Sequence, residues 1–533
     1  MKSLMMDSQL SILSLMEHCE NNYSDTQVCS RRFDGEIERN TYAEVFERTR
    51  MLASALSSAG VKPGSIIATF GQNHLRHFEL YYAITCLGAV CHTINPRLSD
   101  SVIAYIIDHA DDMMIFFDVD YKNKIEAIVC KLNKAPRLIE MNDCSSTEGR
   151  FLDYESFIAG HKITKTWPEL DERQASGLCY TSGTTGHPKG VLYSHRATVL
   201  HAMTLAMANN FAITASDCVL PLVPMYHVNA WGLPFLTVLT GAKLVLPGLH
   251  LDPASIYQLI ETEKVTFIAG VPTILEMLLN FMIKNSLKFS SLKVVAVGGS
   301  AASENLISTY REEHQVEVIH AWGMTEVPQG TAGRLVGDAV KKTPKEQAYI
   351  LSSQGRPLYG VEMRLVGDSG QVLPRNSVAG GHLQVRGPWS CRSYFKSSAT
   401  DSHSEDGWLV TGDIANFDAQ SYLRITDRSK DVIKSGGEWI SSIDIENAAM
   451  SCTGVLLAAA ISIPDPKWQE RPLLIVKTAG EVSEVTEALW EVLKVRLERW
   501  QLPVRIEFTD HIPLGATGKI NKLLLREEYQ ALA

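Results

Sequence analysis

The chain of 533 residues is too long for one ordinary domain, so we expect at least two. Its hydrophobic content of 45% and charged content of 21% are typical of a globular protein that folds in water. The formal net charge of −10 argues against a general nucleic-acid binder, which would present a basic face, although a few local donors could still hold the phosphates of a nucleotide.

The first part of the chain alternates helix and strand signals. Thr41 and Glu44 match a capping box, and apolar residues then recur on one helical face until Gly60. A short apolar strand follows over residues 65–70. This alternation is the first indication of a layered α/β fold.

A long apolar run over residues 218–242 imitates a membrane span, because it contains no Asp, Glu, Lys or Arg. Pro221, Pro224 and Pro234 would interrupt a spanning helix. We therefore expect a buried strand, loop and helix, and no transmembrane segment. Any contact with a membrane would be peripheral.

The strand and helix signals return in the middle of the chain. An apolar strand over 293–297 runs into Gly298 and Gly299, a helix begins after Ser303, and another strand covers 316–320. Strand, helix and strand with short links predict a parallel α/β layer.

The last third changes character. From about residue 354 to 426, short apolar alternations separated by Gly, Pro, Asp and Asn predict a β-rich subdomain. A compact α+β unit follows, with helices expected over 443–450 and 484–500 and strands over 455–462 and 504–508. We thus expect a large N-terminal domain of layered α/β subdomains over 1–428, including the β-rich part, and a small C-terminal domain over 429–533.

The cysteines and the N-terminal residues indicate the cellular compartment in which the protein works. The ten cysteines are scattered, with no CxxC pair and no zinc-ligand spacing, which favours a reducing, cytoplasmic environment. Residues 1–16 include Asp7 and lack an apolar core with a cleavage site, so we expect no signal peptide.

The strongest local signal is the segment 180–190, Tyr-Thr-Ser-Gly-Thr-Thr-Gly-His-Pro-Lys-Gly. Glycines let backbone N–H groups approach an anion, hydroxyls add donors and Lys189 adds positive charge, so the segment predicts a polyphosphate site. It is not a GxxxxGK[ST] P-loop, because Lys189 follows Pro188 and precedes Gly190, which argues against an ordinary kinase or GTPase. A flexible linker would share the composition but has no use for the Pro-Lys-Gly ending.

This segment resembles the signature loop of the adenylate-forming (AMP-binding) superfamily, which includes acyl-CoA synthetases, firefly luciferases and nonribosomal peptide adenylation domains. Other motifs of that superfamily follow in order over nearly the whole chain, and the similarity is greatest to bacterial medium- and long-chain fatty acyl-CoA synthetases. The resemblance implies an AMP-forming ligase that activates a fatty acid with ATP and Mg²⁺ and transfers the acyl group to coenzyme A.

The resemblance also implies nucleotide and metal positions. Thr184 and Glu326 would hold Mg²⁺, which prefers hard oxygen ligands, and Asp413 would accept hydrogen bonds from both ribose hydroxyls. Each short motif is weak alone, since Thr325-Glu326 could simply begin a helix and Thr411-Gly412-Asp413 could be an ordinary turn. The implied ATP- and AMP-binding residues are Thr181, Ser182, Gly183, Thr184, Thr185, Gly186, Lys189, Gly299, Ser300, Ala301, Ala321, Trp322, Gly323, Met324, Thr325, Asp413, Arg428 and Lys519.

The implied acyl pocket consists of His227, Val228, Trp231, Gly298 and Gly323. By resemblance, His227 would lie beside the substrate carboxylate and Trp231 would gate a fatty-acid tunnel, although core packing would also explain both. Acetate-specific relatives carry tryptophan at the position of Gly323, so glycine there implies room for more than four carbons. A filled apolar tunnel would contribute about 0.8 kcal/mol per buried CH₂.

The segment 427–442 resembles the hinge of the family, with Lys430 at the pivot. The residues implied for the hinge and the coenzyme A step are Lys430, Lys434, Gly436, Gly437, Glu438 and Trp439. Near the end, Gly518-Lys519 resembles the catalytic lysine motif, with Leu514-Gly515 in place of the more usual Arg-Thr. His187 in the phosphate loop is a second departure.

The implied catalytic residues are Lys519, His227, Thr184 and Glu326. Lys519 would stabilise charge while the acyl-adenylate forms, and the small, mobile domain would then rotate to admit coenzyme A. An acyl-AMP ligase that loads a carrier protein, and a CoA ligase for a short thioether or aromatic acid, remain alternatives. A catalytically inactive binder is disfavoured by the intact site residues. A homodimer is carried over from the long-chain relatives.

Overall fold

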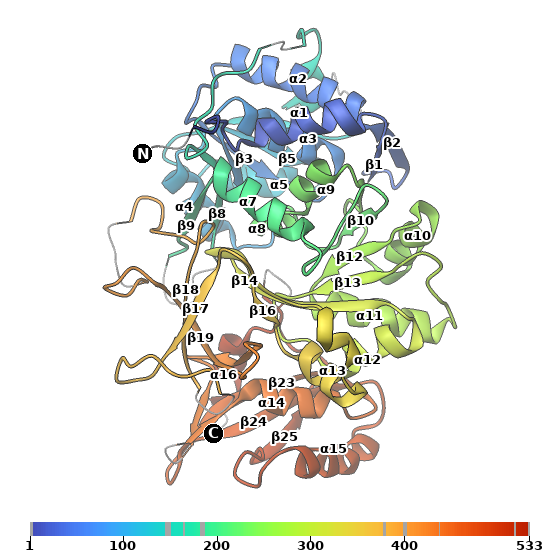
Figure 1. The fold of residues 1–533 in the computed structure, drawn as a ribbon, viewed down its shortest axis with the longest axis vertical. Coiled ribbons are helices and arrows are strands. Elements are labelled where there is room, and N and C mark those ends of the chain that lie inside the picture. Colours follow the sequence, from blue (N-terminus) through green and yellow to red (C-terminus); the bar gives the residue numbers. More distant parts are fainter. Residues whose placement is uncertain are drawn as a thin grey trace.

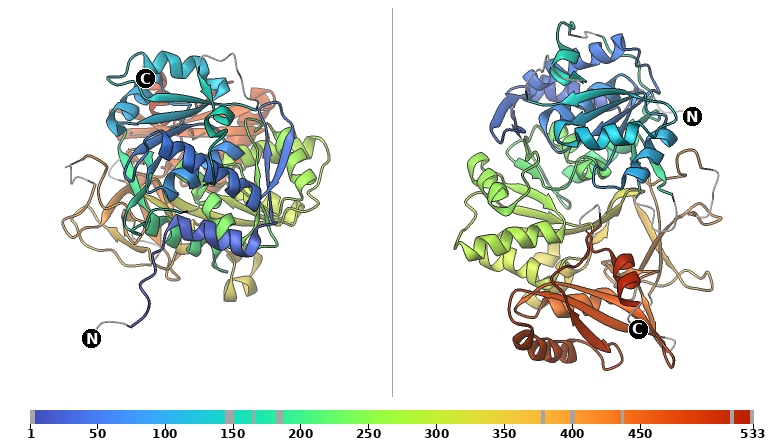
Figure 2. Two further views of the ribbon diagram at one scale, coloured as in Figure 1. Left: turned by 90° about the horizontal axis from the view of Figure 1, so that it is seen from above. Right: turned by 180° about the vertical axis from the view of Figure 1, so that it is seen from behind.

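The computed structural model of the chain describes residues 4–143, 151–163, 166–181, 187–376, 380–397, 402–435, 438–515 and 519–530. In these residues, three sheets and their helices form the larger part of the molecule, and a fourth sheet forms a smaller unit at one end of the long axis (Figure 1). Seen from behind, this C-terminal unit lies next to the sheet that is formed by strands from the middle of the chain (Figure 2). The predicted α/β fold with a small C-terminal α+β unit is confirmed.

A seven-stranded sheet holds the phosphate segment. Its strand order is β7-β6-β5-β3-β4-β8-β9, and all neighbours are parallel except the β8–β9 hairpin. The strands are β3 (Ile66–Phe70), β4 (Val90–Thr93), β5 (Met114–Asp118), β6 (Arg137–Met141), β7 (Leu152–Asp153), β8 (Ala175–Tyr180) and β9 (Gly190–Ser194). Its helices are α2 (Tyr42–Ser58), α3 (Leu75–Cys86), α4 (Asp100–Ala110), α5 (Lys122–Val129) and α6 (Tyr154–Ile158). The predicted Thr41–Glu44 capping box is present at α2.

A nine-stranded sheet occupies the middle of the molecule, with the order β16-β15-β14-β13-β12-β10-β11-β1-β2. Its strands are β1 (Gln27–Arg31), β2 (Ile37–Thr41), β10 (Cys218–Pro221), β11 (Lys243–Leu246), β12 (Phe267–Gly270), β13 (Val294–Val297), β14 (Glu317–Met324), β15 (Val327–Gly333) and β16 (Arg356–Pro357). β12, β13 and β14 are parallel, as predicted, and β15 returns antiparallel to β14. The remaining helices of this part are α1 (Ile12–Tyr23), α7 (His195–Ala206), α8 (Val228–Trp231), α9 (Leu233–Thr240), α10 (Pro253–Glu263), α11 (Pro272–Lys284), α12 (Glu304–Ser308) and α13 (Pro344–Ser352).

The apolar run over 218–242 divides into strand β10, a loop, α8 and α9, as expected. Within the described residues, no helix is both long enough and apolar enough to cross a membrane. The helix expected after Ser303 is short, since α12 ends at Ser308 and a π-helical turn continues from Thr309 to Glu313.

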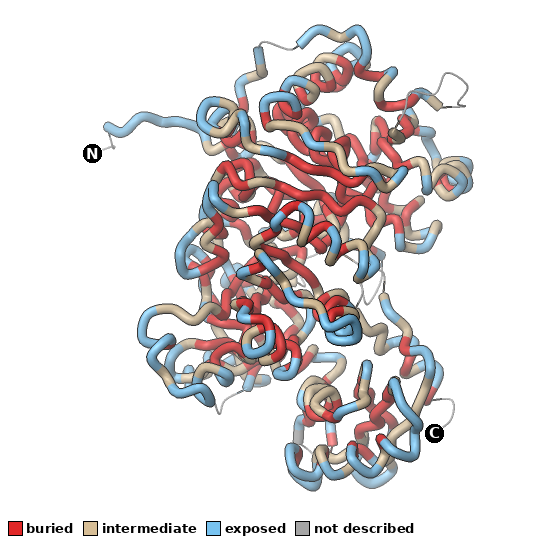
Figure 3. The backbone as a smooth tube through the Cα atoms, turned by 90° about the vertical axis from the view of Figure 1, so that its right-hand side faces the viewer, coloured by how far each residue is buried: buried red, intermediate tan, exposed pale blue. Residues whose placement is uncertain are grey.

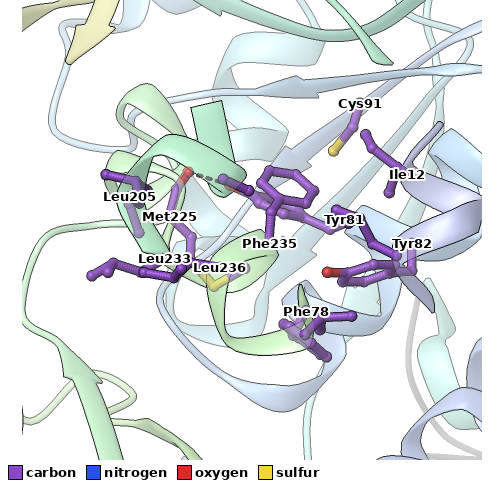
Figure 4. Packing of buried hydrophobic residues seen from close by; sticks show 14 of the residues in the cluster. Ile12, Phe78, Tyr81, Tyr82, Cys91, Leu205, Met225, Leu233, Phe235 and Leu236 are labelled. Atoms are coloured by element: carbon purple, nitrogen blue, oxygen red, sulfur yellow. Dashed lines mark hydrogen bonds between the residues drawn. The ribbon is translucent and has the colours of Figure 1, made fainter. Parts of the chain in front are cut away.

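The largest buried cluster fixes the position of α9. Tyr81 and Tyr82 of α3 pack against Phe235 of α9, with the Tyr81 and Phe235 rings stacked at 5.7 Å (Figure 4). The Tyr82 hydroxyl also donates to the Pro234 carbonyl, 3.0 Å away. Burying one such aromatic side chain contributes about 1.5–3 kcal/mol to the free energy of folding. This packing anchors the residues that immediately precede α9, which belong to the site described below.

The predicted β-rich segment is a four-stranded antiparallel sheet, β17-β18-β19-β20. Its strands are β17 (Glu362–Val366), β18 (Gly381–Arg386), β19 (Leu409–Phe417) and β20 (Leu423–Arg428). β19 and β20 place Asp413 opposite Arg428. The two predicted nucleotide-binding residues are therefore direct neighbours on adjacent strands of one sheet.

The C-terminal unit has its own buried core (Figure 3). It contains β21 (Ile433–Ser435), β22 (Glu438–Ile440), β23 (Val455–Asp465), β24 (Gln469–Thr478), β25 (Arg505–Phe508), α14 (Ser442–Met450), α15 (Val482–Arg496) and α16 (Lys522–Gln530). The predicted helix over 484–500 ends at Arg496, because Leu497 already has extended backbone angles. The half-buried alternation expected over 504–508 is absent, since all residues of β25 are partly buried.

Candidate active site

A cavity of about 280 Å³ lies at the carboxyl ends of β13 and β14, where the β-rich sheet and the C-terminal unit approach. Ligands commonly bind beyond the carboxyl ends of strands in α/β sheets. The predicted site residues that line it are Thr181, Lys189, His227, Val228, Trp231, Gly298, Gly299, Ala321, Trp322, Gly323, Met324, Thr325, Glu326, Arg428 and Lys519. Segments spread over most of the chain thus meet at one place.

Other predicted residues lie outside the cavity lining or outside the described part of the chain. Asp413 touches the cavity residues Trp322 and Arg428, whereas Ser300 and Ala301 lie just beyond the lining turn. Lys430 and Lys434 are exposed, and Trp439 is 37% exposed with its ring edge-on to His382. Ser182, Gly183, Thr184, Thr185, Gly186, Gly436 and Gly437 lie outside the described residues, as does the side chain of Glu438.

The β8–β9 hairpin carries the phosphate segment toward the cavity. At its base the Thr181 N–H donates to the Lys189 carbonyl at 2.9 Å. The exposed Lys189 ammonium lies 4.9 Å from the centre of the Tyr394 ring. His187 stacks on Tyr105, with ring centres 4.6 Å apart. The hairpin therefore presents a cation at the rim of the cavity.

Glu326 is a buried carboxylate at the wall of the cavity, only 6% exposed. The Tyr394 hydroxyl donates to its Oε1 atom at 2.6 Å. Burial, and then the Glu326 charge, raise the pKa of the Tyr394 phenol. Among the described residues, no lysine, arginine or histidine forms an ion pair with Glu326. A buried charge is normally paired or bound to a metal, so this carboxylate suits a cation.

Asp413 links the β-rich sheet to β14. It is 1% exposed, and its Oδ2 atom accepts from the Trp322 indole N–H at 2.9 Å. Its Oδ1 atom lies 2.6 Å from Nε of Arg428. A carboxylate with one hydrogen bond and one ion pair keeps acceptor sites for further hydroxyl groups. The arrangement suits a diol such as ribose.

Lys519 enters the cavity from the C-terminal unit. Gly299, at φ +84°, faces it so closely that an added Cβ would lie 3.7 Å from Cε of the lysine. Burial and the nearby Arg428 guanidinium lower the pKa of Lys519 to about 8, while the Asp413 carboxylate acts in the opposite direction. Burial, and then the Lys519 charge, lower the pKa of His227 to about 4. At pH 7 the lysine is mostly cationic and the imidazole is neutral.

Four consecutive residues without glycine form a left-handed turn at one side of the cavity, which Val228 and Trp231 line. Val228, Asn229, Ala230 and Trp231 have φ values of 48°, 51°, 49° and 55°. Each such residue costs about 1–2 kcal/mol in this conformation. The turn lays the Trp231 ring against the two-glycine turn after β13, where a Cβ on Gly298 would lie 3.3 Å from the indole. Trp231 thus closes one side of the cavity.

Gly323 lies at an irregularity between β14 and β15. A Cβ added there would collide with the Pro328 carbonyl oxygen and lie 2.9 Å from the carbonyl carbon. Any larger residue must therefore push β15 away from β14. The room near Gly323 is set by this close strand approach as well as by the missing side chain.

Several cavity residues were not found by sequence reasoning: Phe211, Pro328, Gln329, Tyr394 and Val410. Gln329 forms a reciprocal pair of hydrogen bonds with the buried Asn210, both 3.0 Å long. Phe211 and Gln329 line the cavity, and the buried Asn210 holds the Gln329 amide in place. The one sequence signal for Tyr394 was the Tyr394-Phe395 aromatic pair within a polar connection. No sequence signal pointed to Asn210.

Comparisons with known proteins agree with this geometry. The profile described as AMP-binding enzyme matches residues 16–395, and the profile described as AMP-binding enzyme C-terminal domain matches 444–519. The chain is 43% identical over 530 residues to a medium-chain-fatty-acid–CoA ligase of Ectopseudomonas oleovorans, covering 98% of this chain and 97% of the relative. It is 42% identical over 532 residues to a 3-methylmercaptopropionyl-CoA ligase of Ruegeria lacuscaerulensis, covering 99% and 98%.

A long-chain-fatty-acid–CoA ligase of Thermus thermophilus is 41% identical over 531 residues, covering 99% of this chain and 97% of the relative. Among solved structures, an anthranilate CoA ligase in complex with anthranoyl-AMP superposes with a TM-score of 0.89 at 22% identity, covering 100% of this chain and 99% of the other. That likeness supports the fold alone.

Proposed function

Because the chain belongs to the AMP-binding enzyme family, we propose that it is an ATP-dependent, AMP-forming acid–CoA ligase. The observation that carries this proposal is the convergence of Lys519, Glu326 and the Asp413–Arg428 pair on one cavity. These groups supply a cation for a reacting phosphate, a carboxylate for a metal ion and acceptors for a ribose. ATP and coenzyme A are the co-substrates.

The substrate we favour is a medium- or long-chain fatty acid. Two relatives of similar length and 41–43% identity carry names of fatty-acid–CoA ligases. The second candidate is a short thioether acid, since the relatives at 42% and 41% identity from two Ruegeria species are named 3-methylmercaptopropionyl-CoA ligases. Loading of a carrier protein, or activation of an aromatic acid, is a weaker alternative.

The proposed metal is Mg²⁺, held by Glu326 and by Thr184 of the phosphate loop. The buried carboxylate of Glu326, which forms no ion pair within the described part of the chain, is a suitable oxygen ligand for that ion. When bound, Mg²⁺ supplies positive charge that stabilises the pyrophosphate leaving group.

The residues of the chain then have separate tasks. Asp413 and Arg428 hold the ribose, and Lys519 stabilises the charge at the α-phosphate while the substrate carboxylate attacks. His227, which is neutral at pH 7, donates a hydrogen bond to the substrate carboxylate and adds no net charge. Trp231 and the left-handed turn keep water from the acyl-adenylate, a mixed anhydride that hydrolyses easily. Rotation about Lys430 would remove Lys519 and let the thiol attack the acyl carbon.

The first test is AMP formation from ATP across straight-chain acids from acetate to palmitate, each with and without coenzyme A. We expect a maximum at eight carbons or more that depends on coenzyme A, because the cavity lining includes the apolar side chains of Phe211, Val228 and Trp231, against which a longer acid would bury more CH₂ groups. A maximum with 3-methylmercaptopropionate would favour the thioether alternative. AMP formation without a thioester product would favour the carrier-protein alternative.

The pH dependence of adenylation should follow Lys519. The lysine is cationic below its pKa and loses its charge above it, so kcat/KM should be level near pH 7 and fall about tenfold per unit well above pH 8. His227 should add no acidic limb above about pH 5. Pyrophosphate exchange measured from pH 5.5 to 10 reports this profile. Lys519→Arg keeps its charge, so the same alkaline limb in that variant would contradict the assignment.

Four further features remain proposals. The domain boundary is placed after residue 428, with the pivot at Lys430. The location is the cytoplasm, any membrane contact is peripheral, and the protein is a homodimer through its large domain. Gel filtration with light scattering tests the last of these.

A further inference from the structure

The connection between β18 and β19 joins two motifs that the sequence separates. Within it, the Cys391 N–H donates to the Glu326 carbonyl at 2.7 Å, and the Phe395 N–H donates to the Gly190 carbonyl at 2.8 Å. The first contact binds the connection to the residues that follow β14. The second contact binds it to the base of the β8–β9 hairpin, which carries the phosphate segment. Backbone hydrogen bonds thus fix the distance between the two motifs, with Tyr394 between them.

Tyr394 contacts the functional side chain of each motif. Its hydroxyl donates to Oε1 of Glu326 at 2.6 Å, and the Lys189 ammonium lies 4.9 Å from the centre of its ring. Further along the connection, the Lys396 ammonium donates to the His109 carbonyl at 2.7 Å, which anchors the segment to α4. The tyrosine is held from both sides and has little freedom to turn away.

From these contacts we infer that Tyr394 is a positioning residue that aligns the Glu326 carboxylate with the Lys189 ammonium for one metal–triphosphate group. This inference rests on the proposed function. The Tyr394 hydroxyl binds Oε1 of Glu326 and so fixes the rotation of the carboxylate. The Oε2 atom is then available to bind a cation. The face of the ring holds the lysine near the same place without neutralising it, because a ring quadrupole attracts a cation but carries no net charge.

The chemistry favours tyrosine for this double task. An ionised carboxylate at residue 394 would lack the donor that Glu326 needs, and an ammonium there would lack the acceptor or π face that Lys189 needs. Tyrosine offers a donor at its tip and a π face on its side. Hydrogen bonds to a metal-ligating carboxylate typically change metal affinity 10–100-fold when they are removed.

The two contacts can be separated by substitution. Tyr394→Phe removes the hydroxyl and keeps the ring, so it should weaken binding of Mg²⁺–ATP about tenfold or more. Binding of metal-free ATP and of AMP should stay unchanged. Tyr394→Leu removes both contacts and should also weaken metal-free ATP about two- to fivefold, the equivalent of about 0.5–1 kcal/mol. AMP lacks the outer phosphates and should bind both variants normally.

The measurement is isothermal titration calorimetry of the full chain with Mg²⁺–ATP, with ATP in EDTA and with AMP. Tyr42→Phe is the matched control, because it removes a buried hydroxyl that donates to the Ala242 carbonyl, and Tyr42 does not line the cavity. Selective loss of Mg²⁺–ATP affinity in Tyr394→Phe supports the inference. Unchanged Mg²⁺–ATP affinity, or an equal loss for all three ligands, overturns it. If the unaltered protein does not bind Mg²⁺–ATP, the proposed function itself fails.

Discussion

Replacing Lys519 with alanine should slow acyl-adenylate formation about 10²–10³-fold, the usual effect of removing one group that stabilises transition-state charge. Thioester formation from supplied acyl-adenylate should change little. The reason is geometric, because Lys519 reaches the cavity on a segment of the C-terminal unit and lies against Gly299. In the proposed mechanism that segment leaves the cavity before coenzyme A arrives.

The two half-reactions should be measured separately, by pyrophosphate exchange and by thioester formation from synthetic acyl-adenylate. Lys494→Ala is a suitable control, because this exposed lysine of α15 does not line the cavity and pairs with the neighbouring Glu491. Equal loss of both half-reactions in Lys519→Ala would contradict the account in which the lysine serves the first step alone.

Replacing Asp413 with alanine should weaken ATP binding at least about 10²-fold. Hydrogen bonds to a charged group are worth about 1.5–3 kcal/mol each, and the proposed ribose contact contains two. The substitution also leaves the Trp322 indole N–H without its acceptor and frees Arg428 from its ion pair. Asp413→Asn, which keeps the shape and one acceptor, should give an intermediate loss.

A comparison with 2′-deoxy-ATP separates ribose binding from general damage. The unaltered protein should bind 2′-deoxy-ATP more weakly than ATP, whereas Asp413→Ala should bind the two nucleotides equally. Such non-additivity is the mark of groups that interact directly. If the variant still distinguishes the two nucleotides as well as the unaltered protein does, the ribose lies elsewhere.

Regular elements could be predicted wherever a periodic apolar pattern had a clear start. The capping box at Thr41 and the helix α14 are examples, because their local signals agree with the tertiary fold. The strand expected over 316–320 continues to Met324, since its end is fixed by pairing with β15. That pairing is tertiary and leaves no mark in the local sequence.

The candidate site was predictable where residues stand in recognisable motifs. Gly299, Glu326, Arg428 and Lys519 were named from the sequence, and the structure brings them around one cavity, although their roles remain predictions. Tyr394 was missed because its importance depends on contacts with two other segments. The Asn210–Gln329 pair was missed for the same reason, because neither amide alone suggests a partner.

The left-handed turn of α8 also bears on how the protein folds. Val228, Ala230 and Trp231 individually avoid this backbone conformation, so an isolated peptide would not form the turn and the segment is locally frustrated. It becomes stable only after α9 has docked on α3 and Trp231 can rest against the glycines that follow β13. We therefore expect this part of the site to order late on the folding pathway, so that a partly folded chain has a nucleotide-binding sheet but no acid-binding wall.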